Sequence, residues 1–410
     1  MTTPHLPLQG ITVLDLSRAL AGPYCSALLA DLGANVIKVE SSKNGDITRL
    51  WPPFEDDHSL YFESTNRNKS SLALDFYSSE GQQVLRRLVA NSDVLLENFR
   101  PGVLQKMGLD HEKLRKDFPQ LVTASITGFG TTGPLKNAAG LDQVAQGMSG
   151  LMSITGPDDN QPYRFGVPII DMTSGIFTAL GIVSALFSSQ TSGHGHHIST
   201  SLLESALALA AFQGQRYLST GELPQAQGND HASITPYGVF QTADTPLIIA
   251  VGNEKQWADF CDTIEAPELL NDPRFSTGRS RTENRDELKP VIEKHLEQRP
   301  ASHWLASIRD AGIPCGPIYN YAQTFADEQV DALQVVKEVT RDDGSRLPLV
   351  RGPLSIDGAP TDIYKAPPKL GSDTLSALEQ AGFSTTEIEQ LLSNNTVAAT
   401  ANSHQNADNH

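Results

Sequence analysis

The chain has 410 residues, 39% hydrophobic and 19% charged, an ordinary globular composition with enough length for two domains. Its formal net charge of −17 argues against a general nucleic-acid-binding surface and against a surface that binds anionic membranes. Three widely spaced cysteines, Cys25, Cys261 and Cys315, fit neither a zinc motif nor a disulfide framework, which predicts a reducing compartment.

The N-terminal residues show no signal-peptide pattern, and the most apolar stretch, residues 175–187, is shorter than a membrane span. These features predict a cytoplasmic protein that has neither a membrane nor a nucleic acid as its partner.

The first part of the chain alternates apolar runs with helical patterns. Residues 11–16 and 35–40 are typical of buried strands, and a helix is expected between them at 24–32, after a turn at Gly22-Pro23. The same alternation continues with a helix at 79–89, a strand at 93–97, a helix from 102 and a strand at 121–126. Strand–helix–strand units imply parallel pairing, so a doubly wound, Rossmann-like α/β domain is predicted.

Small and apolar residues then indicate further helices. After a glycine-rich loop at 127–140, buried helices are expected at 140–151 and 173–189, a turn at 193–197 and a long helix at 200–216. Farther on, an antiparallel strand pair and three amphipathic helices indicate a small α+β domain; they span 237–240, 247–251, 254–264, 283–297 and 301–311.

These patterns predict four parts of the chain. Residues 1–220 form the first part of a large domain, and 221–330 form the small domain with its linkers. Residues 331–393 return to the large domain, and 394–410 form a disordered tail rich in Asn, Ala, Thr and His.

Asp171 is the most informative residue, because it interrupts an apolar run beside glycines and other small residues. Considered alone, an aspartate there is expected most often to be a helix N-cap, with a surface turn and a covalent nucleophile as the alternatives. Capping and nucleophilic roles are compatible, since helix N–H groups and the helix dipole would hold the carboxylate ionised.

Other motifs carry less weight. The glycine-rich loop contains neither of the usual nucleotide-binding glycine patterns, and no G-x-S-x-G elbow supports a serine triad. His194, His196 and His197 lack acidic or cysteine partners at ligand spacing, so an exposed turn is favoured over a metal site.

Basic residues near predicted strand ends leave two interpretations equally open. Arg67, Lys69, Arg100 and Lys106 could bind phosphates, or they could simply be solvated surface charges.

A set of sequence blocks, taken in order, is more specific than any single motif. The blocks are residues 8–23, 30–40 followed by Gly45-Asp46, 66–75, 97–102, 125–130 followed by Gly133-Pro134, then Asp171, and finally 312–317. From about residue 8 to 393, the chain resembles the class III CoA-transferase family, which includes formyl-CoA transferase, carnitine CoA-transferases and α-methylacyl-CoA racemase.

The resemblance implies a fold and a mechanism. Two chains would interlock as a homodimer, each with a Rossmann-like large domain built from both chain ends and a small domain between. Acyl-CoA would be a substrate, with no tightly bound cofactor and no metal. Asp171 would attack the donor thioester to form a mixed anhydride, which CoA thiolate would convert into an aspartyl-CoA thioester before the acceptor carboxylate enters.

The resemblance also assigns CoA-binding positions: Leu20, Ala21, Leu74, Asn98, Phe99, Arg100 and Lys106. Arg100 and Lys106 would contact phosphates. Ser41 and Ala139 stand where relatives carry basic residues, and Lys38, Arg67 or Lys136 are expected to compensate.

Within the family, a transferase is favoured over a racemase or epimerase. Racemases carry a histidine directly before the aspartate that Asp142 matches, whereas here that residue is Leu141, which cannot move a proton. A non-catalytic CoA-binding protein is least favoured, because Asp171 is retained.

Three stretches, 66–69, 153–157 and 228–237, look more like family members that use dicarboxylates such as succinate and glutarate. His231, Ser233 or Arg164 would then bind the distal carboxylate of the acceptor.

Overall fold

A computed structural model describes residues 6–400, and it divides into two compact units. The large unit comprises Met1–Leu151, Phe165–Leu218 and Leu333–His410, and the small unit comprises Met152–Arg164 and Ser219–Ala332. The predicted boundaries at 220 and 330 lie close to two of these changes of unit. Residues 152–164 belong to the small unit, whereas the sequence predicted them to be part of the large domain.

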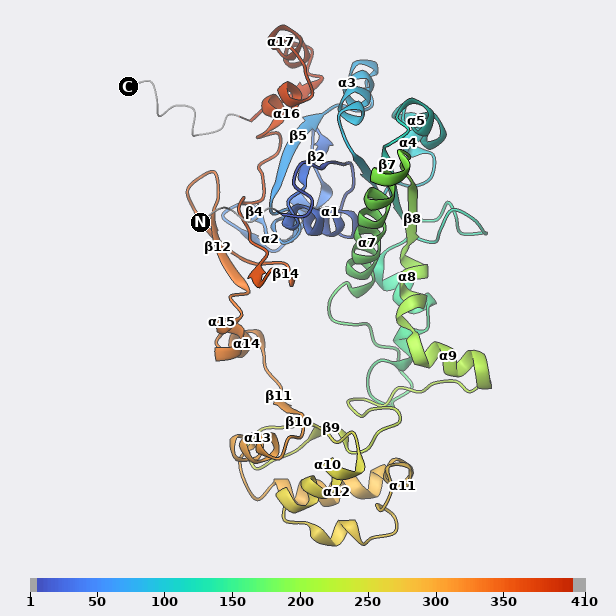
Figure 1. The fold of residues 1–410 in the computed structure, drawn as a ribbon, viewed down its shortest axis with the longest axis vertical. Helices are drawn as coiled ribbons and strands as arrows, with labels where there is room; N and C mark the ends of the chain where they lie inside the picture. The colour runs from blue at the N-terminus through green and yellow to red at the C-terminus, as the bar shows by residue number, and fades with distance from the viewer. Residues whose placement is uncertain (1–5, 401–410) are drawn as a thin grey trace. The chain divides into compact units, whose positions relative to one another are not determined.

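The large unit is built on a seven-stranded sheet in the order β16-β5-β2-β1-β6-β7-β8 (Figure 1). The first six strands of the chain in this sheet are mutually parallel where they pair. They are β1 (Thr12–Asp15), β2 (Asn35–Ser41), β5 (Lys69–Leu74), β6 (Val94–Glu97), β7 (Val122–Thr127) and β8 (His197–Ser201). This arrangement confirms the predicted α/β fold with a parallel sheet.

The central strands β1 and β6 are buried on both faces of the sheet, which explains why they are mostly apolar. Successive side chains of a strand point to opposite faces, so Val13 and Leu14 of β1 belong to different cores. Val13 packs in the core that contains residues of α1 (Ala21–Asp31) and α7 (Ile169–Ser192). Leu14 packs in the core that contains residues of α3 (Ser79–Ala90) and the C-terminal helices.

Helix α1 begins earlier than expected, and Gly22-Pro23 lies inside its first turn rather than in a separate turn. Proline is tolerated there because the first N–H groups of a helix have no intrahelical partner. Gly175 of α7 faces this turn: a Cβ at that position would lie 2.7 Å from the Ala21 carbonyl oxygen. Glycine therefore permits the close approach of α7 to α1.

Helix α7 (Ile169–Ser192) is longer than the apolar stretch at residues 175–187, which by itself is too short to span a membrane. Its 24 residues are long and apolar enough to cross a membrane, by length and composition alone. In the large unit it packs against α1, β7 and β8, and buried helices of this kind pass the same test.

Three segments near α7 differ from the predictions. The expected turn at 193–197 ends in β8, which starts at His197, and the expected helix at 200–216 is two helices. These are α8 (Leu202–Leu209) and α9 (Ala211–Thr220), separated at Ala211, whose φ of 41° is not helical. The expected helix at 140–151 is the shorter α6 (Asp142–Met148), only partly buried.

Short elements complete the N-terminal part of the large unit. They are η1 (Ile47–Leu50), β3 (Phe54–Glu55), β4 (His58–Ser59), α2 (Leu60–Glu63), α4 (Val103–Lys106), α5 (His111–Asp117) and η2 (Leu151–Ile154).

The small unit has a three-stranded antiparallel sheet in the order β11-β10-β9. The predicted pair, β9 (Tyr237–Phe240) and β10 (Leu247–Ala250), is confirmed, and β11 (Cys315–Pro317) was not predicted. Its helices are α10 (Glu254–Thr263), η3 (Pro267–Leu270), α11 (Gly278–Glu283), α12 (Arg285–Leu296), α13 (Ala301–Asp310), α14 (Tyr321–Phe325) and α15 (Glu328–Ala332). One apolar core, which includes Trp257, Phe260 and Trp304, holds this unit together.

The C-terminal helices of the returning segment lie beside the N-terminal strand β5 and helix α3 (Figure 1). The segment contains β12 (Val336–Thr340), β13 (Arg346–Val350), β14 (Ser355–Ile356), β15 (Ala359–Pro360), α16 (Thr374–Gln380), α17 (Thr385–Ser393) and β16 (Val397–Ala398).

The predicted disordered tail is wrong for residues 394–400. Strand β16 pairs antiparallel with β5, and Val397 is buried in the core because it fits beside Leu74 and α17. Residues 401–410 of that predicted tail lie outside the described residues.

Candidate active site

The order of the parallel strands defines a switch point between β1 and β6. From β1 the chain moves outward to β2 and β5, and then returns to β6 on the other side of β1. Loops at the carboxyl ends of these two strands therefore diverge, and open α/β sheets bind ligands at that position. The loops concerned are residues 16–20 after β1 and 98–102 after β6.

Asn98 joins the two loops. Its Oδ1 accepts a hydrogen bond from the backbone N–H of Arg18 at 2.8 Å, and its Nδ2 donates one to the Arg18 carbonyl at 2.7 Å. The Arg18 guanidinium lies over the Phe99 ring, 5.2 Å from its centroid. Asn98 thus has a structural role in shaping the predicted CoA site, which sequence reasoning did not foresee.

Buried charged side chains stabilise the loop after β1 by contacts with its backbone. Lys38, fully buried, forms an ion pair with Asp46 at 2.9 Å and donates to the Ser17 carbonyl at 2.8 Å. Asp46 Oδ1 accepts the backbone N–H of Ala19, whose positive φ of 65° is unusual for alanine. These contacts fix the path of the loop toward α1.

This arrangement contradicts part of the predicted phosphate site. Lys38 and Lys69 are fully buried, and Lys69 donates to Asn66 and to the Pro23 carbonyl. Burial lowers the pKa of Lys69 to about 7 despite the nearby Asp15 carboxylate. Arg67 is also buried and forms a bidentate pair with Asp31. None of the three side chains is available to a phosphate, because the fold supplies each with internal partners.

The other predicted CoA-binding residues divide into buried and exposed positions. Leu20 and Ala21 are buried at the start of α1, Phe99 is buried after β6, and Leu74 is fully buried at the end of β5. Arg100 and Lys106 are exposed. Leu74 therefore cannot offer its side chain to a ligand, whereas the two exposed cations can.

Arg18 and Lys136 are exposed cations as well. Arg18 was missed as a candidate, although its position directly after β1 was a usable signal. Lys136 lies in the loop that follows β7, whose two ends approach closely: a Cβ on Gly128 would lie 2.6 Å from the Gly140 Cα.

Asp171 is the third residue of α7, and Pro168 occupies the N-cap position. The interpretation of Asp171 as the N-cap is therefore wrong. Asp142, the first residue of α6, caps α7 instead: its Oδ1 accepts the backbone N–H groups of Ile170 at 2.7 Å and Asp171 at 3.2 Å. The cap was not predicted because it comes from another helix.

The expectation that Asp171 is held ionised is also wrong for this structure. Burial, followed by the negative charge of Asp142, raises the pKa of Asp171 to about 7. Among residues 6–400, no hydrogen bond to the Asp171 carboxylate counters these effects. Both effects favour the protonated form of the Asp171 carboxyl group.

Tyr61 on α2 belongs to the same electrostatic environment. Its pKa is raised by burial and then by the charges of Asp171 and Asp142. Its ring packs edge-on against Trp51, with centroids 5.1 Å apart. The sequence offered no signal for Tyr61, because it lies far from Asp171 along the chain.

The fold brings Asp171 to the start of α1. The neighbouring Ile170 shares an apolar cluster with Ala21, and Gly175, one turn later in α7, faces the Ala21 carbonyl. The carboxylate thus lies at the same end of α1 as the loop after β1. Leu141, at the N-cap of α6, is 68% exposed and offers no proton-transfer group.

The structure also places the histidines that were considered as metal ligands and the residues that were predicted to bind the acceptor. His197 lies in β8 and bonds Thr123, while His196 bonds Ser188. No group of three potential metal-ligating side chains occurs in the described part of the chain. His231, Ser233 and Arg164 belong to the small unit, where the His231 ring stacks on Tyr237.

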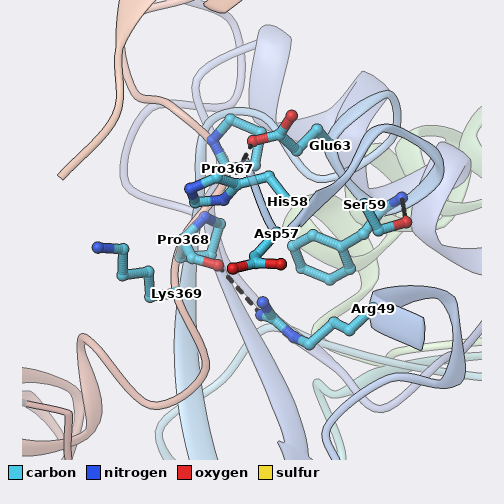
Figure 2. Close-up of a pocket in the computed structure, with 9 residues that line it drawn as sticks. Arg49, Asp57, His58, Ser59, Glu63, Pro367, Pro368 and Lys369 are labelled. Carbon is cyan, nitrogen blue, oxygen red and sulfur yellow. Dashed lines mark hydrogen bonds and ion pairs between the residues drawn. The ribbon is translucent and has the colours of Figure 1, made fainter. Parts of the chain in front are cut away.

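A polar pocket of about 80 Å³ lies in the large unit, and none of the candidate residues named above lines it (Figure 2). It is lined by Arg49, Asp57, His58, Ser59, Phe62, Glu63, Pro367, Pro368 and Lys369. Arg49 donates to Glu40 and to the Pro368 carbonyl, and Glu63 pairs with Arg341. These groups connect the N-terminal part of the large unit to its returning segment.

Comparison with known proteins identifies the class. The sequence profile described as CoA-transferase family III matches residues 8–374, so the chain belongs to this family and is a CoA-transferase.

Curated relatives extend over most of the chain. It is 40% identical over 381 residues to a succinate–glutarate CoA-transferase from Agrobacterium fabrum, covering 91% of this chain and 95% of the relative. It is 41% identical over 321 residues to an acetyl-CoA:oxalate CoA-transferase from Acetobacter aceti, covering 78% and 82%. A crystal structure of a CAIB/BAIF family protein from Brucella suis superposes with a TM-score of 0.81 at 38% identity, covering 92% and 100%.

Proposed function

We propose that this CoA-transferase moves CoA from an acyl-CoA to a dicarboxylate such as succinate or glutarate, with Asp171 as the covalent nucleophile. The observation that carries the proposal is the Asp171 carboxyl group, half-buried beside the start of α1, with its pKa raised to about 7. The names of the relatives that act on succinate, glutarate and oxalate support the dicarboxylate acceptor.

The proposed reaction proceeds by acyl exchange on Asp171. An Asp171 carboxylate oxygen attacks the donor thioester carbonyl, and the carbon–sulfur bond breaks to release CoA thiolate and leave a mixed anhydride. The thiolate attacks the aspartyl carbonyl carbon, releasing the donor acid as its carboxylate. The acceptor carboxylate then attacks the aspartyl-CoA thioester, which expels CoA thiolate and leaves a second mixed anhydride between Asp171 and the acceptor. The thiolate attacks the acceptor acyl carbon of this anhydride, which forms the new acyl-CoA and releases the Asp171 carboxylate.

In this proposal CoA lies at the switch point between β1 and β6. The exposed cations Arg18 and Arg100 flank it, and Lys106 lies on the next helix, so they are suited to the negatively charged phosphates. The thioester would extend along the start of α1 toward Asp171.

A homodimer is part of the proposal. Ile176, Leu180 and Phe187 form an exposed apolar stripe along α7, with helical spacing. A second copy of the chain would cover such a stripe. Light scattering at micromolar concentration tests this part, and a monomer that is fully active would contradict it.

A donor–acceptor panel tests the activity. With succinyl-CoA as donor, we expect the acyl-CoA of glutarate or of another dicarboxylate to form, and Asp171→Asn to abolish its formation. Asp159→Asn, a change in the small unit, is the matched control. An Asp171→Asn protein that transfers CoA at the parent rate would remove Asp171 from the mechanism.

The racemase alternative is tested separately by following the α-proton of a branched acyl-CoA in deuterated water. Exposed Leu141 supplies no base for this exchange, so none is expected. Exchange at a rate comparable with CoA transfer would support the racemase instead.

A further inference from the structure

A carboxylate–amide network connects α6 to the start of α7. Asp142 Oδ2 accepts a hydrogen bond from Gln146 Nε2 at 2.5 Å, while its Oδ1 accepts the N–H groups of Ile170 and Asp171. Gln146 Oε1 in turn accepts the N–H of Phe165 at 2.9 Å, in the segment that leads into α7. Both side chains of the network are buried, Asp142 to 9% exposure and Gln146 to 2%.

This network replaces the usual cap of α7. The first N–H groups of a helix lack intrahelical partners, and a carboxylate near them is stabilised as an anion. Here Asp142 receives those N–H bonds, so the Asp171 carboxylate does not. The carboxyl groups of Asp142 and Asp171 both lie at the start of α7, but only that of Asp142 accepts hydrogen bonds from the first N–H groups of the helix.

We propose that Asp142 is a positioning residue for Asp171: it fixes the first turn of α7 and accepts the helix N–H groups that the Asp171 carboxylate would otherwise accept. The inference deepens the proposed function and rests on Asp171 being the nucleophile. A carboxylate of higher basicity attacks a thioester carbonyl more readily, and it departs less readily from the mixed anhydride.

The neighbouring ionisable groups are few. Elements packed against α7 carry Tyr24 and Cys25 on α1 and Glu204 on α8 near its N-terminal half, together with Asp142 on α6. Tyr61 on α2 lies within the field of Asp171 and Asp142. Asp142 is the group whose charge raises the pKa of Asp171, and Glu204 is bonded to Ser201.

The test separates the effect of the negative charge of Asp142 from the effect of its hydrogen bonds to the start of α7. Asp142→Asn keeps an oxygen that accepts the N–H groups but removes the negative charge and the acceptor of the Gln146 hydrogen bond, whereas Asp142→Ala removes all three. Asp110→Asn is the control, because Asp110 caps α5 through two N–H bonds elsewhere in the large unit. The readouts are the ionisation midpoint of Asp171, from the carbon-13 shift of its carboxyl carbon, and the pH profile of kcat.

In Asp142→Asn we expect the Asp171 midpoint and the acidic limb of kcat to move down by about one pH unit, and the kcat plateau to fall about fivefold. In Asp142→Ala, kcat should fall further, by about a hundredfold, because the turn is also displaced. Asp110→Asn should leave the midpoint unchanged. A purely structural role for Asp142 would change the thermal midpoint but not the ionisation midpoint of Asp171.

An unchanged Asp171 midpoint in a folded Asp142→Asn protein overturns the inference and leaves the proposed function intact. Activity in Asp171→Asn overturns the proposed function instead. Should both Asp142 variants fail to fold, the unmodified protein decides: an Asp171 midpoint near pH 7 supports the inference, and one below pH 5 contradicts it.

Discussion

The side-chain amide of Asn98 bonds both the N–H and the carbonyl of Arg18, and so ties the loop after β6 to the loop after β1. The two residues are 80 positions apart in sequence and meet at the switch point of the sheet. Replacing Asn98 with Ala leaves two backbone groups of Arg18 without this partner, which costs about 1–2 kcal/mol. We expect the KM for acyl-CoA to rise about tenfold with kcat within about threefold of the parent.

Steady-state kinetics across acyl-CoA concentrations check this prediction, and Asn98→Asp separates the two bonds because it keeps an acceptor and loses the donor. A kcat that collapses while KM is unchanged would place Asn98 in the chemical step rather than in the shape of the site.

The exposed cations at the switch point are predicted to bind CoA phosphates. Arg18→Ala, Arg100→Ala and Lys106→Ala should each weaken CoA binding about three- to tenfold, and the loss should be smaller at high salt. Calorimetric titration with CoA and with 3′-dephospho-CoA will show which cation contacts the 3′-phosphate. Lys113→Ala, an exposed lysine on α5, is the control and should leave both affinities unchanged.

The buried ion pair of Lys38 and Asp46 is predicted to stabilise the loop after β1. The pKa of Lys38 is raised by Asp46 and other carboxylates, and that of Asp46 is lowered by Lys38, although burial opposes both shifts. Lys38→Met leaves Asp46 buried without its cation and should lower the free energy of unfolding by about 3–5 kcal/mol. Urea unfolding measures this, and a change below about 1 kcal/mol would contradict it.

The raised pKa of Asp171 predicts a pH-dependent stability. The folded protein binds the proton more tightly than the unfolded chain, so this contribution is fully present below about pH 4 and is lost as pH rises toward 7. Asp171→Asn should therefore match the parent below pH 4 and be more stable above pH 7, by about 2 kcal/mol after allowance for partial exposure. Urea unfolding at pH 4 and pH 8 gives the comparison; equal stability at both would contradict the raised pKa.

Strand β16 gives a prediction about the C-terminus. A chain that ends after Asn395 loses the pairing with β5 and the burial of Val397, which should cost about 2–3 kcal/mol of unfolding free energy. A chain that ends after Thr400 keeps both and serves as the control. Identical unfolding curves for the two truncated proteins would show that β16 contributes nothing.

The regular parts of the fold could be predicted from local patterns. The strands at β1 and β2 and the helix between them are evident because both faces of a parallel sheet are apolar. Strand β8, with the sequence His-Ile-Ser-Thr-Ser, lacks that signal because it is the edge strand and is largely polar. Strand β16 has two residues and depends on its pairing with β5, which no local pattern reveals.

The site was less predictable, because its decisive contacts are non-local. Asp171 was recognised from the order of the family blocks, but its cap, Asp142, lies 29 residues earlier in another helix. Lys38 and Lys69 were candidates for phosphate binding, but the fold buries them beside Asp46, Asn66 and Asp15. Burial of a charge depends on partners that sequence spacing does not reveal.

The covalent role of Asp171 is tested most directly by trapping the aspartyl thioester. The protein is mixed with succinyl-CoA in the presence of hydroxylamine, digested, and analysed by mass spectrometry, with Asp171→Asn treated in parallel. We predict an aspartyl hydroxamate on the peptide that contains Asp171, formed only when acyl-CoA is present and absent from the variant. A hydroxamate at another carboxylate, or CoA transfer that proceeds without any trapped Asp171, would contradict the role of Asp171 as the nucleophile.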